Sequence, residues 1–194
     1  CVTLYSRIPQ NYRKNGSISL CDISSYFGLS VVWNVSSLNI ETSVALVEEQ
    51  GSSQCRVNAL SQRYDLTLLD SRQLPDSGFN YYLQYTSQGL CLCENKPNAA
   101  SPSRVDFLSD ELLSRAKDKV KNQNLLKAIG IKKHPQSSVL DAMAGFGKDA
   151  FLLAYAGCSV QMLERSPVIH ALLDDGLSRL AESFSMPDLC DRLT

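Results

Sequence analysis

The sequence predicts a mixed α/β protein whose C-terminal half carries a parallel sheet. The spacing of apolar residues changes near Asp110, from a period close to two to a period close to 3.6. From residue 138 onward, a strand, a glycine-rich turn, a helix, a strand and a second helix follow at the spacing of a βαβ unit. We therefore expect a small N-terminal α/β domain with antiparallel strands over residues 1–100. The first part of the parallel core should occupy residues 104–194.

The N-terminal elements are short strands separated by polar residues. Apolar alternation predicts strands at 31–33, 43–47 and 64–69. Segments 81–85 and 90–93 flank a polar stretch that ends in Gly89, which is typical of a hairpin. Residues 95–103 contain two prolines and few apolar side chains, so we expect a linker there.

A basic helical segment follows the linker. Its apolar positions recur at helical spacing from Leu112 to Ile129, and Gly130 stands where a helix-ending glycine is expected. Only Asp118 opposes the seven cations of this segment, which are Arg115, Lys117, Lys119, Lys121, Lys127, Lys132 and Lys133. On charge alone, a solvated helix face is favoured over a contact with a phosphate backbone.

The βαβ unit comes next. A short strand at 138–140 leads into a turn of small residues at 141–149 and a helix at 150–156 that Gly157 closes. The second strand covers 159–163. Ser166 and Pro167 then form an N-cap followed by proline at the first helical position, which opens a long amphipathic helix.

Two carboxylates mark a candidate ligand site in this unit. Asp141 and Glu164 follow neighbouring strands, and ligands of open α/β sheets bind at the carboxyl ends of strands. Gly145 and Gly147 let the backbone approach a ligand, because glycine has no Cβ. Glu164 could accept hydrogen bonds from ribose hydroxyls, Asp141 could face an ammonium group, and Lys148 could pair with a carboxylate. S-adenosylmethionine (SAM) carries all three groups.

Other interpretations of the same residues remain open. The glycines could be ordinary turn residues, Asp149 could complement the dipole of its helix, and Glu164 with Arg165 could be a surface pair. A nicotinamide-dependent oxidoreductase is an alternative, because the dinucleotide fingerprint tolerates the alanine found at Ala150. A phosphate-binding P-loop is excluded, since Asp149 stands where that motif needs Ser or Thr.

Composition limits the remaining classes. The chain has 194 residues, 44% of them hydrophobic and 20% charged, with a net charge of −1, which is typical of a globular protein. No apolar run is long enough for a membrane span. The seven cysteines form no C-x-x-C pair, so we expect no metal site and mostly buried, free thiols in a cytoplasmic protein.

Residues 139–180 closely resemble the RsmJ family of SAM-dependent 16S ribosomal RNA guanine-N2 methyltransferases. The family pattern D-A-T-A-G-L-G-R-D-A-F corresponds to D-A-M-A-G-F-G-K-D-A-F at 141–151. The pattern M-L-E-R-N-P-V-x-x-A-L-L-D-D-G-L corresponds to M-L-E-R-S-P-V-I-H-A-L-L-D-D-G-L at 162–177. The resemblance implies a Rossmann-like class I methyltransferase core and makes Lys148, Asp149, Glu164 and Arg165 cofactor contacts.

The resemblance also implies a reaction and a substrate. A methyl group would pass from SAM to the exocyclic N2 of a guanine in 16S rRNA or the small ribosomal subunit. The basic residues Arg115, Lys117, Lys119 and Lys121 would contact the rRNA backbone.

Two features depart from the family pattern. The basic run lacks the glycines and the histidine of its relatives, and no Asp-Pro-containing motif follows a later strand up to Thr194. We therefore expect the chain to be a fragment, with its core partial and its catalytic residues after Thr194. A catalytically inactive RNA-binding module with the same fold is a further alternative.

Overall fold

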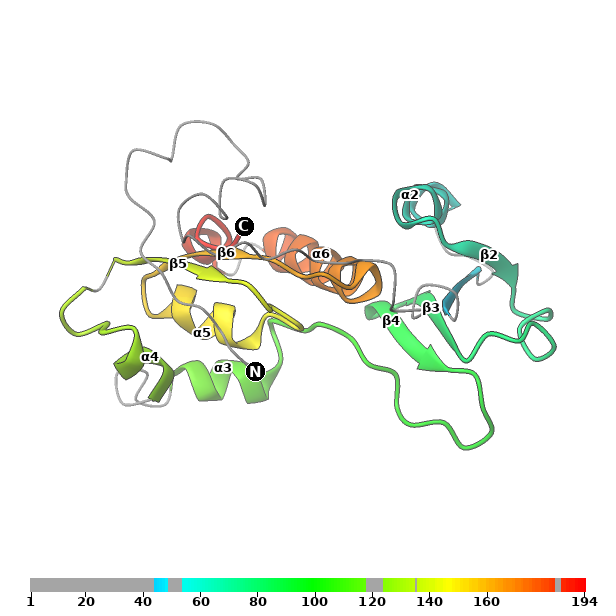
Figure 1. Ribbon diagram of the computed structural model, residues 1–194, viewed down its shortest axis with the longest axis horizontal. Coiled ribbons are helices and arrows are strands. Elements are labelled where there is room, and N and C mark those ends of the chain that lie inside the picture. The colour runs from blue at the N-terminus through cyan, green and yellow to red at the C-terminus, as the bar shows by residue number, and fades with distance from the viewer. Residues whose placement is uncertain (1–43, 49–53, 118–123, 135, 184–185) are drawn as a thin grey trace, which may run out of the picture.

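The computed structural model describes residues 44–48, 54–117, 124–134, 136–183 and 186–194. The strand expected at 31–33 lies outside the described residues. Two sheets lie toward opposite ends of the molecule, and α6 (Pro167–Glu182) reaches from one toward the other (Figure 1). No helix within the described ranges is both long and apolar enough to cross a membrane.

The N-terminal unit is a four-stranded sheet with one helix. Its elements are β1 (Val44–Glu48), α2 (Gln54–Tyr64), β2 (Thr67–Asp70), β3 (Tyr81–Thr86) and β4 (Gly89–Glu94). The strand order is β2-β1-β3-β4. The central strand β1 is the most apolar, and Ala45 and Leu46 are fully buried in it. A central strand is covered on both faces, which explains its continuous apolar sequence.

The hairpin prediction is confirmed, because β3 and β4 pair antiparallel around a two-residue turn at 87–88. The rest of the sheet differs from the expected antiparallel arrangement, since β1 pairs parallel with both β2 and β3. The strand expected at 64–69 was placed too early. Tyr64 ends α2, and Asp65 adopts a left-handed backbone with φ of 51°, so the strand begins only at Thr67.

The predicted linker at 95–103 contains neither a helix nor a strand, but its end pairs with the sheet. Leu92 and Ser103 form an antiparallel bridge through two backbone hydrogen bonds of 2.8 and 2.9 Å. The Asn95 side chain donates to the carbonyls of Leu74 and Phe79 at 3.0 and 2.8 Å. These contacts fix the path by which the chain leaves β4 for the core.

The C-terminal unit confirms the predicted βαβ arrangement. Its further elements are α3 (Asp110–Lys117), α4 (Asn124–Ala128), β5 (Ser138–Asp141), α5 (Lys148–Tyr155), β6 (Ser159–Met162) and α7 (Pro187–Cys190). β5 and β6 pair parallel with Asp141 opposite Met162. Ser166 caps α6 by accepting a hydrogen bond from the Ile169 N–H, as predicted. Gly130 has the expected positive φ, 71°.

The last residues of the chain add a third parallel segment that the sequence analysis did not predict. Met162 donates its N–H to the Thr194 carbonyl at 2.7 Å, and Thr194 donates to the Val160 carbonyl at 3.0 Å. Val160 and Leu193 form a parallel bridge. The sheet therefore continues on the β6 side beyond the two named strands.

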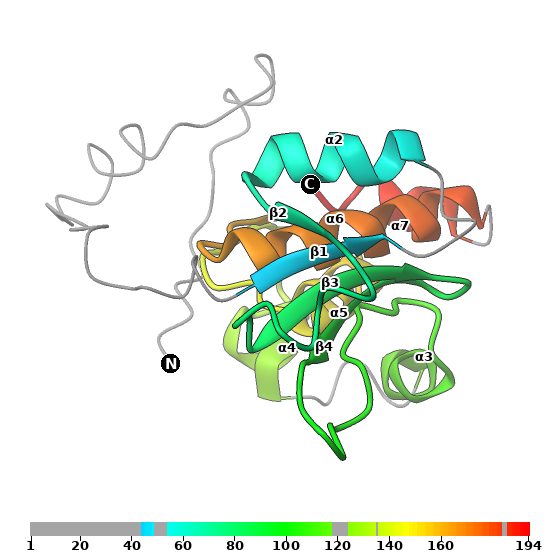
Figure 2. The same cartoon turned by 90° about the vertical axis from the view of Figure 1, so that its right-hand side faces the viewer.

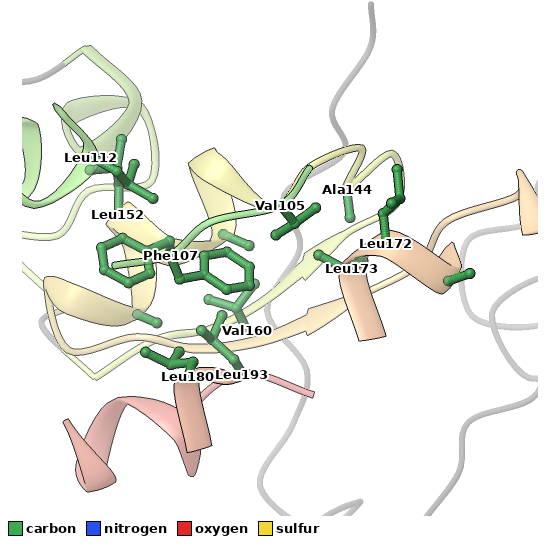
Figure 3. Packing of buried hydrophobic residues seen from close by; sticks show 14 of the residues in the cluster. Val105, Phe107, Leu112, Ala144, Leu152, Val160, Leu172, Leu173, Leu180 and Leu193 are labelled. Atoms are coloured by element: carbon green, nitrogen blue, oxygen red, sulfur yellow. The ribbon is translucent and has the colours of Figure 1, made fainter. Parts of the chain in front are cut away.

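The core of this unit forms around α5, in which Ala150 to Ala154 are all buried. Phe107 stacks on Phe151 with ring centroids 5.6 Å apart. Leu112 of α3 points toward Leu152 of α5 (Figure 3). Because α5 starts directly after the glycine turn, this packing fixes the position of the turn relative to α3.

One face of α6 holds the N-terminal unit against the core. Asp175 accepts hydrogen bonds from the Leu90 N–H at 3.0 Å and from Arg179 Nε at 2.8 Å. Arg179 also donates to the Val105 carbonyl. The Tyr64 hydroxyl lies 2.7 Å from His170 Nδ1, so α2 packs against the same helix (Figure 2).

Candidate cofactor site

The acidic residues that follow β5 and β6 lie at one edge of the sheet, as predicted. Asp141 ends β5, and its carbonyl accepts the Leu163 N–H at 2.8 Å. The Leu163 carbonyl in turn accepts the Ala144 N–H at 3.1 Å. The two segments therefore stay hydrogen-bonded beyond the strands, which places Glu164 beside the turn that Asp141 begins.

Asp141 is a buried carboxylate, with 3% of its surface exposed. It accepts one hydrogen bond, from the Met143 N–H at 3.2 Å. Burial raises the pKa of Asp141, and the nearby negative charges of Asp149 and Glu164 raise it further. Three carboxylates thus influence one small region, and a positively charged ligand group would relieve their repulsion.

Glu164 accepts hydrogen bonds with both of its carboxylate oxygens. Oε2 accepts the Gly145 N–H at 2.9 Å, and Oε1 accepts the Ser166 N–H at 2.8 Å. Each carboxylate oxygen can accept more than one hydrogen bond, so these contacts leave capacity for ribose hydroxyls. The same residue therefore supports the turn and remains suited to a ligand.

The two glycines of the turn have different roles. Gly145 and Gly147 both have left-handed backbones, with φ of 53° and 69°. A Cβ at Gly147 would lie 2.9 Å from both Leu173 Cδ1 and Phe107 Cζ, whereas a Cβ at Gly145 would meet nothing within 4 Å. Gly147 is buried, and its lack of a side chain allows the turn to pack on the core, whereas the space around Gly145 is open.

A hollow of about 390 Å³ opens beside this turn. This volume lies within the range of small-molecule sites. It is lined by Arg115, Asp141, Met143, Ala144, Phe146, Lys148 and Asp149. Lys148 and Asp149, both predicted site residues, are exposed at the start of α5.

A family model matches the part of the chain that contains this site. Residues 59–194 match the model described as a putative SAM-dependent methyltransferase. The chain belongs to this family of SAM-dependent methyltransferases.

Two of the curated relatives of this chain share a name. Ribosomal RNA small subunit methyltransferase J from Pseudomonas fluorescens (strain Pf0-1) is 38% identical over 160 residues, covering 76% of this chain and 59% of the relative. The protein of the same name from Dechloromonas aromatica is 45% identical over 116 residues, covering 59% of this chain and 47% of the relative. These matches confirm the resemblance to the RsmJ family. The methyltransferase chain spans about half the length of the curated relatives it matches.

A solved structure supports the fold. The crystal structure of a SAM-dependent methyltransferase from Neisseria gonorrhoeae matches with a TM-score of 0.59 and 26% identity. The match covers 78% of this chain and 58% of that one. The expected Rossmann-like core, with its parallel strands and the turn after β5, is confirmed.

The residues present fit SAM, the cofactor of the family. The hollow combines the acidic Asp141 and Asp149 with the basic Arg115 and Lys148. The methionine part of SAM carries an ammonium, a sulfonium and a carboxylate. Its positive groups can therefore meet the acidic side chains of the hollow, and its carboxylate can meet the basic ones. The family match therefore favours SAM over the nicotinamide alternative.

Gly145, Gly147 and Glu164 do not line the hollow, and several other predicted residues lie outside it or outside the described residues. Arg165 is exposed and does not line the hollow. Lys117 is exposed at the end of α3, while Lys119 and Lys121 fall outside the described residues. Arg115, predicted as an RNA contact, lines the hollow, and its Nη2 lies 3.6 Å from Asp149 Oδ1.

The apolar side chains that line the hollow were not predicted as site residues. Met143, Ala144 and Phe146 all belong to the predicted turn but were given no role. The signal that could have identified them is an apolar side chain within a turn. Met143 is such a residue, and 55% of it is exposed.

Proposed function

We propose that this chain is the cofactor-binding part of a methyltransferase that modifies the exocyclic N2 of a guanine in 16S rRNA. The observation that carries the proposal is that Asp141 and Glu164 both lie at the Gly145 turn, at the carboxyl edge of a parallel sheet. The names of the curated relatives support the rRNA substrate. The small ribosomal subunit is then the partner, and the cytoplasm is the location of the reaction.

Each residue of the turn has a role in this proposal. Glu164 accepts the ribose hydroxyls of SAM with the lone pairs that its backbone contacts leave. Asp141 faces the ammonium group, whose positive charge offsets the clustered carboxylates. Lys148 and Asp149 contact the methionine part from the first turn of α5. Arg165, the exposed residue after Glu164, is a further candidate contact to the cofactor.

The cofactor supplies an electrophilic methyl group on a sulfonium. Transfer of that methyl group to the guanine N2 would leave S-adenosylhomocysteine and pass the N2 proton to water, while Asp141 and Glu164 would hold the cofactor in place. The lone pair of that amine is delocalised into the ring, so alignment with the S–CH₃ bond is the main requirement. Aligned reactants can supply about 7–11 kcal/mol of the barrier. Extruding a stacked guanine would cost a few kcal/mol.

The exposed lysines of α3, α4 and the following turn form a candidate rRNA contact. The described ones are Lys117, Lys127, Lys132 and Lys133. Phosphate contacts of this kind position a nucleic acid without reading its sequence. In the proposed enzyme they would orient the rRNA while other contacts select the guanine.

Two experiments test the proposed function. Calorimetry should give heat on addition of S-adenosylhomocysteine and none on addition of NADH, and the reverse result would support the oxidoreductase alternative. The full-length protein that contains this chain should transfer tritium from labelled SAM to 30S subunits from cells that lack the enzyme. Binding to 30S subunits without transfer would instead indicate an inactive RNA-binding module.

A further inference from the structure

Arg115 reaches the hollow from an element outside the βαβ unit. It lies on α3, whose Leu112 and Ala116 are buried. Because positions 112 and 116 are one helical turn apart, they fix the face that α3 turns toward the core. Leu112 points toward Leu152 of α5 (Figure 3), and α5 begins with Lys148 and Asp149. The packing of α3 on α5 therefore brings the Arg115 guanidinium to the hollow.

The contact of Arg115 with Asp149 is a long, exposed ion pair. Arg115 Nη2 lies 3.6 Å from Asp149 Oδ1, which is longer than a hydrogen bond. Their side chains are 49% and 52% exposed, and exposed ion pairs of this kind are weak. A ligand carboxylate can therefore attract the guanidinium away from Asp149.

We propose that Arg115 binds the carboxylate of the methionine part of SAM, while Asp141 takes the ammonium of the same group. This inference rests on the proposed function. The planar guanidinium can bind both oxygens of a carboxylate, which the Lys148 ammonium cannot do in the same geometry. Arg115 is then a cofactor residue rather than the rRNA contact that the sequence suggests.

The charges of the hollow favour this ligand over an RNA phosphate. Two carboxylates, Asp141 and Asp149, offset the positive charges of Arg115 and Lys148 there, so the lining offers a phosphate no net positive charge. A zwitterion instead presents a positive group to Asp141 and a negative group to Arg115. The carboxylate and the ammonium of an amino acid are attached to one carbon, so one ligand can satisfy both residues.

The test uses two ligands that differ only in the carboxylate. S-adenosylhomocysteine has it, and the decarboxylated analogue keeps the amine but lacks it. In the full chain, Arg115→Gln should lower the affinity for S-adenosylhomocysteine by roughly tenfold or more. This is the size expected for losing a charge-assisted hydrogen bond. The same change should leave the affinity for the decarboxylated analogue unaltered, and Arg115→Lys should restore part of the loss.

The controls separate the outcomes. Lys117→Gln, an exposed residue of the same helix, should leave both affinities unchanged. An equal loss for both ligands would overturn the proposal, because Arg115 would then act only by supporting Asp149. Unchanged cofactor affinity together with weaker 30S binding would also overturn it. That result would indicate that Arg115 contacts an rRNA phosphate. If the unmodified chain bound neither ligand, the proposed function itself would fail.

Discussion

The carboxylate of Glu164 accepts the backbone N–H of Gly145 at 2.9 Å. This hydrogen bond joins the segment after β6 to the turn after β5, across 19 positions of sequence. Its other oxygen holds the N–H of Ser166, the residue that caps α6. The acidic side chain proposed to bind ribose therefore also sets the shape of the turn and the start of the next helix.

We expect Glu164→Ala to weaken SAM binding by about 1–3 kcal/mol, the usual cost of leaving buried polar partners unpaired. The same substitution removes the acceptor of the Gly145 and Ser166 N–H groups, so stability should also fall. Calorimetry with S-adenosylhomocysteine and thermal unfolding measure the two effects. Glu182→Ala, an exposed position at the end of α6, is the matched control. Unchanged affinity in Glu164→Ala would mean that the ribose is held elsewhere.

Asp141→Asn should stabilise the chain in the absence of cofactor. Asn retains an oxygen for the Met143 N–H but removes a charge that burial makes unfavourable. We therefore expect a higher Tm than that of the unmodified chain at neutral pH. The same variant should bind SAM less tightly, because the ammonium loses its partner. A lower Tm at neutral pH would contradict this account.

The stability difference between Asp141→Asn and the unmodified chain should depend on pH. The pKa of Asp141 is raised in the folded state above the ordinary 3.8. Below the ordinary value the carboxyl is neutral in both states, so burial costs nothing there. As the pH rises through the folded pKa, the folded state must carry a buried charge and the unmodified chain loses stability. Urea unfolding at several pH values should show the difference growing toward neutral pH, and a difference that shrinks would refute the assignment.

Gly147→Ala should destabilise the chain more than Gly145→Ala. Both positions have a positive φ, which costs a residue other than glycine about 1–2 kcal/mol. Only at Gly147 would the added Cβ also overlap Leu173 and Phe107, at 2.9 Å each. Overpacking of this kind typically adds 1–3 kcal/mol. Denaturant unfolding of the two variants measures the difference, and equal losses would show that packing at Gly147 can relax.

Asp175→Ala should destabilise the attachment of the N-terminal unit, while Asp174→Ala should not. Asp175 is 11% exposed in its side chain and holds both Arg179 and the Leu90 N–H. Its loss should cost about 1–3 kcal/mol, because the N–H is left without an acceptor. Asp174 pairs with Arg63 at the surface, where such pairs contribute about 0–1 kcal/mol. Thermal unfolding and limited proteolysis near β4 should distinguish the variants, and similar losses would show that Asp175 has no special role.

Local signals predicted the core unit well. Ser166 and Pro167 open α6, Gly130 has its left-handed backbone, and β5 and β6 pair with Asp141 at the strand end. The helix start and the glycine depend on residues a few positions apart, and the strand pairing follows from the spacing of one βαβ unit. The N-terminal unit was harder to predict, because α2 buries only Val57 and so shows little helical periodicity. The parallel pairing of β1 with β2 and β3 likewise depends on contacts that no short window contains.

The sequence by itself determined the βαβ unit, the acidic strand ends and the resemblance to one family, because these are encoded in spacing along the chain. Only the tertiary structure decided that Gly147 packs against the core and that Arg115 lines the hollow. Both outcomes arise from contacts between separate segments, Phe107 and Leu173 on Gly147 and α3 on α5. The physical reason is that close packing fixes which side chains share a space, and sequence spacing does not.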